Sequence, residues 1–185
     1  MLIYSMGVSA DGFISDREGG FDWGAPDEEL FAFHLERVAG LGAHVSGRRL
    51  YEAMLPWETD PAMRATPLYA RFADVWSELP KVVFSRTLDR VEGNARLAEA
   101  SLPDELSTVL AGTGRNVEVG GATLAAQAIE AGFVDEFRIF RYPIVVGGGT
   151  PFFPPLARQI PLELLESRTF QSRVVYERYR RAPHD

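Results

Sequence analysis

Glycine, arginine and hydroxyl side chains gather at three points of this 185-residue sequence, each where a short apolar run ends. The segments are Val45–Arg49, Val83–Thr87 and Val119–Thr123, and helical patterns follow the first and the third. A glycine at a helix N-terminus lets an anion approach unpaired backbone N–H groups at the positive end of the helix dipole. These points are therefore candidates for binding phosphate.

Arginines occupy two of these segments. Arg48 follows the glycine of the first, and Arg86 follows the serine of the second. A guanidinium group offers a fork of donors that matches a phosphate. Two helix N-termini together with two arginines suit a dinucleotide that carries a pyrophosphate and an additional 2′-phosphate, which is NADPH. Each motif alone is common in proteins without such a ligand, so the order and spacing of the three carry the prediction.

The sequence excludes several other kinds of site. It has no cysteine, which rules out disulfides and cysteine-ligated metals, and it lacks the Rossmann, P-loop, zinc-protease and serine-hydrolase motifs. His34 and Glu36 match half of a zinc deaminase signature whose cysteines are missing, so no metal is predicted. The net charge of −7 argues against a nucleic-acid partner. Because no apolar run is long enough for a membrane helix and no signal peptide is recognisable, a cytoplasmic protein is expected.

Apolar periodicity predicts strands that alternate with helices. Strands are expected over 2–8, 13–15, 43–45, 81–85, 117–119 and 134–146, and within 168–179. Helices are expected over 27–38, from 47 onward, and over 68–79, 104–110 and 122–131. Pro143 falls inside the longest predicted strand, which favours an edge or a bulge there. The pattern indicates a single α/β domain with a mixed sheet.

The three segments resemble motifs of the dihydrofolate-reductase-like family, and in particular of its RibD C-terminal reductase group. The matching stretches read V-S-G-R-R-x-Y-E, V-V-F-S-R-T-L and V-G-G-A-T-L-A, followed by V-D-E-F-R-I-F-R-Y-P-I-V-V-G-G-G-T-P-F-F. The opening S-A-D-G-F-I-S and the closing R-V-V-Y-E-R-Y are also similar, so the resemblance covers nearly the whole chain. It implies one domain over residues 1–185 with a three-layer fold, in which helices flank a mixed, mostly parallel central sheet.

The resemblance also implies which residues bind NADPH. In that family the two glycine-led helices hold the cofactor pyrophosphate, and the serine-arginine strand end meets the phosphate on the adenosine ribose. By motif position the cofactor-binding residues are Gly47, Arg48, Arg49, Ser85, Arg86, Thr87, Gly120, Gly121, Ala122 and Thr123. Residues 144–149 are expected close to the active-site side of the sheet. Leu50 stands where the family often has threonine, which removes one hydroxyl donor to the pyrophosphate.

Reduction by hydride transfer also needs a proton, which a buried carboxyl of raised pKa can supply. The helix after Trp23 resembles the substrate-side helix of dihydrofolate reductase, and this makes Glu29 the candidate acid, with Glu28 and Asp27 as alternatives. A first-turn acid that only favours the helix dipole explains Glu29 equally well. Asp11, beside the expected nicotinamide pocket, is either a second catalytic candidate or a turn former.

Aromatic side chains could stack on a flat heterocycle. Trp23 and Phe33 are predicted to line the substrate pocket. Phe31, Trp57 and Trp76 are predicted to lie in the core, as aromatics at helical spacing usually do.

Taken together, these features predict an NADPH-dependent reductase of a small heterocycle that resembles dihydrofolate or 5-amino-6-(5-phosphoribosylamino)uracil. Riboflavin-pathway enzymes usually carry an Asp-Asp-Pro segment tied to a phosphosugar substrate, whereas this chain has only Asp60-Pro61. The alternative is an NADP-binding scaffold that keeps the fold without turnover. The resemblance further implies a homodimer, to which the apolar segment Pro151–Leu156 could contribute an interface.

Overall fold

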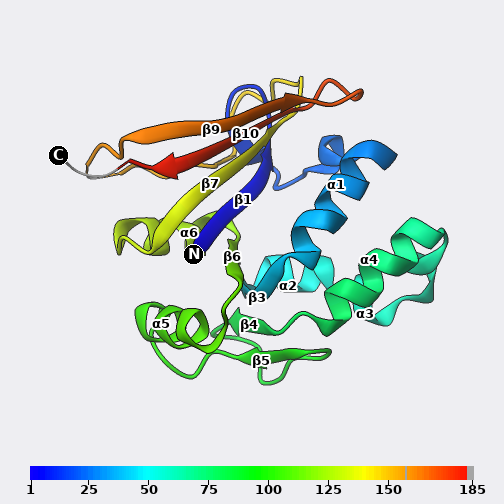
Figure 1. Cartoon of the computed structure of the whole chain (residues 1–185), viewed down its shortest axis with the longest axis vertical. Helices are drawn as coiled ribbons and strands as arrows, with labels where there is room; N and C mark the ends of the chain where they lie inside the picture. Colours follow the sequence, from blue (N-terminus) through cyan, green and yellow to red (C-terminus); the bar gives the residue numbers. More distant parts are fainter. Residues whose placement is uncertain (157, 183–185) are drawn as a thin grey trace.

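One eight-stranded sheet organises the chain (Figure 1). The computed structural model describes residues 1–156 and 158–182, and within them the strand order is β5-β4-β3-β6-β1-β7-β10-β9. The strands from β5 to β7 in this order pair in parallel, and β10 pairs antiparallel with β7 and β9. The strands are β1 (Leu2–Val8), β3 (Leu41–Gly47), β4 (Lys81–Phe84), β5 (Ala95–Leu97), β6 (Asn116–Gly120), β7 (Val134–Arg141), β9 (Leu162–Thr169) and β10 (Val175–Arg181). Two short strands, β2 (Phe13–Ser15) and β8 (Thr150–Pro151), form a separate ladder.

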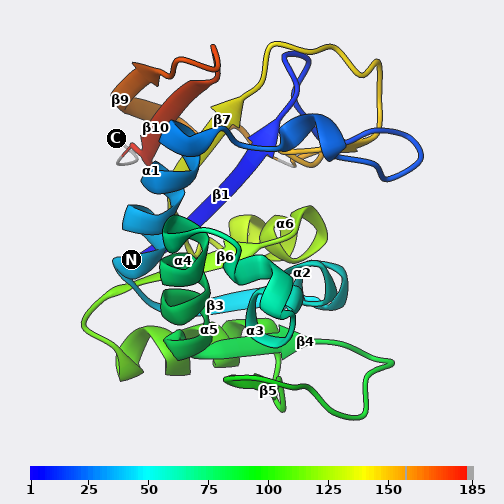
Figure 2. The same cartoon turned by 90° about the vertical axis from the view of Figure 1, so that its right-hand side faces the viewer.

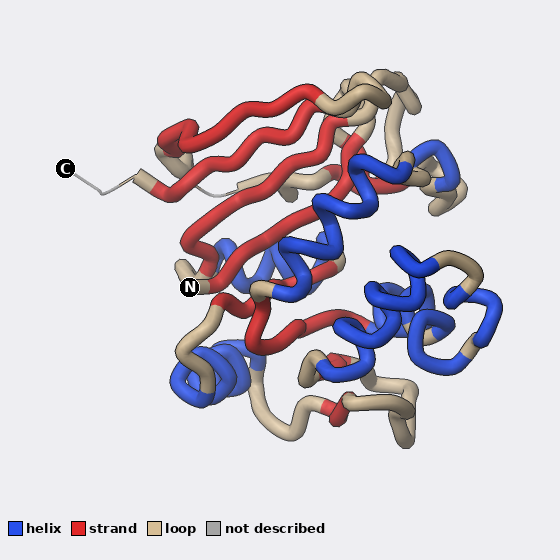
Figure 3. Tube along the Cα trace, turned by 45° about the vertical axis from the view of Figure 1, so that its right-hand side comes forward, coloured by secondary structure: helices blue, strands red, loops and turns tan. Residues whose placement is uncertain are grey.

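Helices cover both faces of the sheet (Figures 1 and 2). One face carries α5 (Leu102–Gly112) and α6 (Ala122–Glu130). The other face carries α1 (Glu28–Ala39), α2 (Arg48–Met54), α3 (Pro56–Thr59) and α4 (Pro67–Glu78), with the short 3-10 helices η1 (Asp22–Gly24) and η2 (Pro61–Arg64). Figure 3 shows the strands as one layer with helices on either side. The predicted three-layer α/β architecture, with a mixed and mostly parallel sheet, is confirmed.

Alternation of side chains along the strands divides the core between the two faces. Tyr4 and Phe137 belong to the core cluster that includes α5 and α6, and both are fully buried. On the other face, the aromatic residues of α1 and α4 pack together, with Phe31 and Trp76 buried and Trp57 packed against them. The prediction that these three aromatic residues belong to the core is confirmed.

Two predictions about the strands are wrong. The strand expected over 134–146 ends at Arg141, and β7 lies in the interior of the sheet between β1 and β10. The chain leaves the sheet before Pro143, because proline has no N–H for a ladder hydrogen bond. The final hairpin begins at Leu162 rather than near Arg168, and β5 was not predicted. The sequence of β9 shows no apolar alternation because its side chains are exposed along nearly its whole length.

The only lysine of the chain ties the helical layer to the sheet. Lys81 in β4 is buried, and its ammonium group donates to the backbone carbonyls of Trp76 and Leu79 at 2.5 and 2.8 Å. It also forms a buried ion pair with Glu58 of α3 at 3.0 Å. Glu58 in turn accepts the backbone N–H of Asn94 at 3.1 Å. This ion pair therefore links α3, the end of α4, β4 and the loop before β5.

We expect Lys81→Met to lower the free energy of unfolding by about 3 kcal/mol, because it leaves the buried carboxylate of Glu58 without its cation. Urea unfolding followed by tryptophan fluorescence measures this difference. The double variant Lys81→Met, Glu58→Gln removes both charges and should recover part of the loss. Arg71→Ala on the exposed face of α4 is the control, and a Lys81→Met protein as stable as this control would contradict the assigned role.

Candidate active site

The three segments singled out in the sequence end neighbouring parallel strands. β4, β3 and β6 are adjacent in the sheet, with Gly47 opposite Phe84 and Ser46 opposite Gly120. Because parallel strands present their carboxyl ends at one edge, the turns that follow them lie together. In Figure 2 this edge lies to the right of the view, where α2 follows β3. The structure thus brings the predicted cofactor-binding segments to one place.

The two helices that leave this edge lack the side-chain caps that the three longest helices have. Asp27, Thr66 and Ser101 cap α1, α4 and α5, each by accepting a backbone N–H with a side-chain oxygen. In contrast, α2 and α6 follow Gly47 and Gly121, which have no side chain that could do so. The first N–H groups of a helix have no partner within the helix. At α2 and α6 these groups are therefore available to an anion.

The three glycines at this edge differ in backbone conformation and in the space that a Cβ would have. Gly121 has a φ of +89°, and a Cβ there would meet nothing within 4 Å. Gly47 has a φ of −81°, which any residue adopts, and a Cβ there would also meet nothing within 4 Å. Gly120 is covered, because a Cβ there would collide with Leu50 of α2 and His44 of β3. Leu50 therefore packs on Gly120, in the position where the family resemblance leads us to expect a hydroxyl donor.

The arginines of this edge lie on its exposed side. Arg48 pairs with a glutamate one turn later in α2 at 3.3 Å, and both side chains are about half exposed. Arg49 and Arg86 are exposed as well. The Ser85 hydroxyl oxygen accepts two following backbone N–H groups at 3.1 and 3.0 Å, which fixes the turn that carries Arg86. The three arginine side chains are therefore accessible to a ligand in solvent.

Asp11 joins two loops beyond the carboxyl end of β1. Its carboxylate accepts the backbone N–H groups of Val146 and Gly147 at 3.1 and 2.8 Å. The Ser9 hydroxyl, followed by these backbone donors, lowers the pKa of Asp11. The turn-forming interpretation fits these contacts, and the role of a proton donor does not. The loop 144–149, expected near the active site, is held by this carboxylate.

Glu29 lies at the exposed start of α1 rather than in a pocket. Its carboxylate accepts from Arg168 at 2.8 Å and from the backbone N–H of Gln171 at 2.9 Å, both near the β9–β10 turn. The Gln171 N–H, followed by Arg168, holds the pKa of Glu29 below its usual value. The expectation of a buried carboxyl of raised pKa at this position is therefore wrong. Of the alternatives, Asp27 is the helix cap and Glu28 is exposed.

The two aromatic residues predicted to line the substrate pocket have different surroundings. Trp23 lies edge-on to Tyr142 with ring centroids 5.7 Å apart, and its Nε1 is buried without a hydrogen-bond partner in the part of the chain that the structure describes. Phe33 packs against Phe170 and Tyr176 with ring centroids 5.2 and 5.0 Å apart. Phe33 is thus a packing residue between α1 and β10, and the predicted pocket role does not fit it.

The Arg37 side chain of α1 points toward the sheet and forms a polar cluster that the sequence analysis did not identify. Arg37 Nη2 donates to Ser5 Oγ of β1 and to Glu118 Oε2 of β6, both at 2.8 Å. Its Nη1 lies 3.4 Å from His34 Nδ1. Burial raises the pKa of Glu118 against the opposing effect of the Arg37 charge. One signal was available in the sequence, because Glu118 interrupts the apolar run of β6 and a buried charge there requires a partner.

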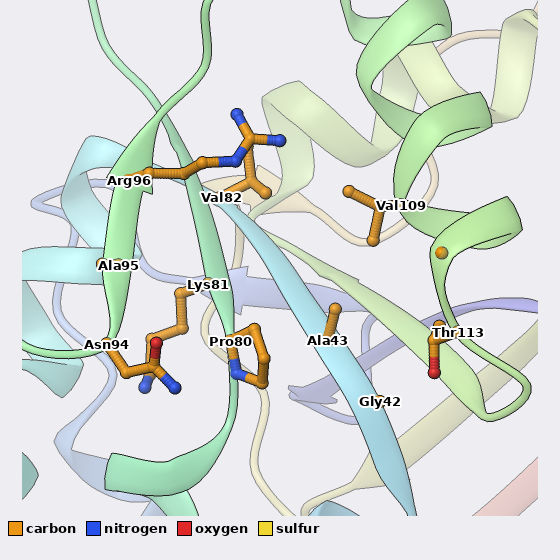
Figure 4. Close-up of a pocket in the computed structure, with 11 residues that line it drawn as sticks. Gly42, Ala43, Pro80, Lys81, Val82, Asn94, Ala95, Arg96, Val109 and Thr113 are labelled. Carbon is orange, nitrogen blue, oxygen red and sulfur yellow. The ribbon is translucent and has the colours of Figure 1, made fainter.

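A cavity of about 350 Å³ lies at the amino ends of β3 and β4 (Figure 4). Its lining includes Ala43, Val82 and Val109, and Arg96 from β5. The Arg96 guanidinium group is already bound by the carboxylate of Glu105 at 2.5 Å. This cavity is at the opposite edge of the sheet from the three turns, so it is separate from the candidate site.

Within residues 1–156 and 158–182, no helix has the length and apolar content that a membrane crossing requires. The same residues contain no group of three or more histidine, aspartate or glutamate side chains placed to hold a metal ion.

Comparison with known proteins identifies the family. The family model of the RibD C-terminal domain matches residues 1–176, so this chain belongs to the RibD C-terminal domain family. The uncharacterized protein YyaP of Bacillus subtilis (strain 168) is 29% identical over 182 residues, which cover 94% of this chain and 91% of YyaP. The family resemblance found in the sequence is confirmed.

Solved structures share the fold. A protein provisionally assigned to riboflavin biosynthesis, from Shewanella sp. PV-4, matches with a TM-score of 0.76 at 23% identity, over 98% of this chain and 99% of that chain. Dihydrofolate reductase from Enterococcus faecalis, complexed with NADP(H) and RAB-propyl, matches with a TM-score of 0.67 at 18% identity, over 99% and 97%. The chain therefore has the fold of dihydrofolate reductase.

The contact made by Asp11 predicts a local change on substitution. In Asp11→Ala, the amides of Val146 and Gly147 lose their acceptor, and their hydrogen exchange should become about tenfold faster. Exchange followed by mass spectrometry at peptide resolution measures this. Asp89→Ala, at an exposed position of another loop, is the control, and equal exchange of residues 144–149 in the two variants would show that Asp11 does not hold the loop.

Proposed function

We propose that this protein is an NADPH-dependent reductase of a small heterocyclic substrate. The observation that carries the proposal is the meeting of two uncapped, glycine-led helix N-termini and an arginine-bearing turn at one edge of the sheet. A dinucleotide with a pyrophosphate and a 2′-phosphate is the ligand whose charges match this set of donors.

The residues present fit such a cofactor. We assign the pyrophosphate to the backbone N–H groups of 47–49 and 121–123, because the open space at Gly47 and Gly121 lets a phosphate reach the backbone. We assign the 2′-phosphate to the guanidinium groups of Arg48 and Arg86, with the Ser85 turn holding Arg86 in place. When bound, NADPH supplies the hydride for reduction of a C=N or C=O group.

Similar proteins support this proposal. The Enterococcus dihydrofolate reductase, which has the same fold, is complexed with NADP(H). The similar Shewanella protein is provisionally assigned to riboflavin biosynthesis. Both fit a substrate that resembles dihydrofolate or 5-amino-6-(5-phosphoribosylamino)uracil, which are flat heterocycles with ring carbonyl or imine groups.

A second candidate function is that of an NADP-binding scaffold without turnover. The observation that favours it is the loss of both predicted acids, since the contacts of Glu29 and Asp11 keep these carboxylates ionised. NADPH oxidation followed by absorbance, with dihydrofolate and with the aminouracil substrate, separates the two functions. Oxidation of NADPH that depends on either substrate supports the reductase. Tight NADPH binding without oxidation by either substrate supports the scaffold.

We also propose that the protein forms a homodimer in solution. The segment Pro151–Leu156 contributes less to an interface than its composition implies, because Phe152 is buried and stacks on Tyr4 of the same chain at 4.2 Å. Phe153 remains 37% exposed, and Leu164 in the edge strand β9 is 54% exposed. These apolar side chains are candidates for the interface.

The arginine assignment predicts cofactor selectivity. NADPH should bind at least tenfold more tightly than NADH, which corresponds to about 1.4 kcal/mol. Arg86→Ala should weaken NADPH binding by about tenfold and leave NADH binding nearly unchanged, because only NADPH carries the 2′-phosphate. Isothermal titration calorimetry measures both affinities, with Arg71→Ala as the control on α4. Equal affinities of the parent for the two cofactors would overturn the assignment.

The glycine assignment predicts a separation of binding from stability. Gly47→Ala places a methyl group in the phosphate space at an ordinary φ, so NADPH binding should weaken at least tenfold while the melting temperature changes little. Gly121→Ala should weaken binding too, but its positive φ adds a stability loss of about 1–3 kcal/mol. The two variants thus separate obstruction of the ligand from backbone strain.

Thermal unfolding with and without NADPH tests both variants, because a bound ligand raises the melting temperature by mass action. Gly114→Ala is the matched control, since a Cβ there also meets nothing within 4 Å and the residue precedes β6 at the opposite edge of the sheet. A Gly47→Ala protein that NADPH stabilises as strongly as it stabilises this control would place the cofactor elsewhere.

A further inference from the structure

The inward face of α1 carries two polar residues, His34 and Arg37. Leu30, His34 and Arg37 all face the sheet from successive turns of the helix, and Leu30 is fully buried. Two hydrogen bonds anchor Arg37 to the sheet. Its Nη2 donates to Ser5 Oγ of β1 and to Glu118 Oε2 of β6, both at 2.8 Å. Its guanidinium carbon also lies 5.1 Å from the ring centre of Phe140. Arg37 therefore has little freedom to move.

Arg37 fixes the hydrogen-bonding state of His34. Its Nη1 lies 3.4 Å from His34 Nδ1, and because arginine has no acceptor, the imidazole nitrogen must accept. The ring proton then lies on Nε2, which has no hydrogen-bond partner among the described residues. Burial, followed by the charge of Arg37, lowers the pKa of His34 to about 3, so the ring is neutral at physiological pH. The ring is also fixed by Phe140, with centroids 4.4 Å apart.

This cluster lies beside the candidate cofactor edge. Ser5 and Glu118 precede Gly7 and Gly120 by two residues, so they lie on the same face of their strands and about 7 Å upstream. The ring of His34 covers Phe140, which is the register partner of Gly7 at the carboxyl end of β1. Glu29, the acid expected on this helix, instead contacts Arg168 near the β9–β10 turn. His34 is therefore a hydrogen-bond donor on the sheet-facing side of α1, over Phe140 of β7.

We propose that the His34 Nε2–H donates a hydrogen bond to a ring carbonyl oxygen or imine nitrogen of the substrate, and that Arg37, anchored by Ser5 and Glu118, is its positioning residue. This inference rests on the proposed reductase function and names the group that orients the substrate. Hydride addition to the carbon moves the electron pair of the double bond onto this oxygen or nitrogen, where a neutral donor stabilises the negative charge. A water molecule from the solvent then protonates this atom and leaves hydroxide, so His34 keeps its Nε2 proton.

A purely structural role for His34 makes the opposite prediction for two variants. His34→Phe keeps an aromatic ring to pack on Phe140 but has no N–H donor. His34→Gln loses the ring but carries an amide N–H at a similar reach. If His34 only packs, the phenylalanine variant should behave better in every assay. If His34 holds the substrate, the two orders should be opposite. The phenylalanine variant should then be the more stable one, and the glutamine variant should bind substrate more tightly.

The test uses the full chain saturated with NADP⁺, with dihydrofolate and 5,6-diaminouracil as the probes. Calorimetry should give a probe affinity for His34→Phe about tenfold weaker than for the parent, as expected for one lost hydrogen bond. His34→Gln should bind the probe more tightly than His34→Phe while melting at a lower temperature. Glu36→Gln, exposed on the same helix, is the control and should match the parent. Probe affinities that follow the melting temperatures, or no binding of either probe to the loaded parent, would overturn the inference.

A spectroscopic readout separates the donor from general packing effects. In ¹⁵N NMR spectra the parent should show a neutral His34 protonated on Nε2, and this resonance should shift when the bound probe is added. An unshifted resonance in a probe-saturated sample would overturn the inference. Failure of the proposed function itself would differ, because the parent would then fail to bind NADP⁺ before any probe is added.

Discussion

Parallel pairing of β3 with β4 and with β6 is the constraint on which the candidate site depends. It brings the ends of three strands to one edge, with Ser46 opposite Gly120 and Gly47 opposite Phe84. Two helices start there with glycine in place of a capping side chain. The first N–H groups of these helices have no partner within the helix, which makes them candidates to bind an anion. The candidate site is therefore a property of the backbone, and we propose that the arginines add selectivity.

The helical layer that faces this edge is positioned by buried charges. Lys81 joins Glu58 of α3 to β4, and Arg37 of α1 joins Glu118 of β6. A shift of either helix would leave a buried charge unpaired, which costs about 3–5 kcal/mol. These ion pairs thus limit the positions that α1 and α3 can take over the sheet. The placement of α1 puts His34 against Phe140 of β7, whereas Glu29 contacts Arg168 near the β9–β10 turn.

Local signals explain what the sequence could predict. Gly47, Arg86 and Gly121 lie within a few residues of a strand end, and the strands themselves have clear apolar patterns. Their meeting at one edge then follows from the mostly parallel sheet that the family resemblance implies. Glu29 and Phe33 were misplaced because a helix turns about 100° per residue, and a shift of one position directs a side chain to another surface. Glu118 in the apolar run of β6 signals a buried charge that needs a partner, but that partner, Arg37, lies 81 positions away and no local pattern identifies it.

The central claim is that NADPH lies across the carboxyl edge of β4, β3 and β6, and a crystal structure of the NADP⁺ complex tests it most directly. The account predicts pyrophosphate oxygens within about 2.7–3.2 Å of backbone N–H groups at the starts of α2 and α6. It also predicts the 2′-phosphate beside Arg86. A cofactor bound at the amino ends of β3 and β4, or one whose phosphates contact neither helix, would contradict the account.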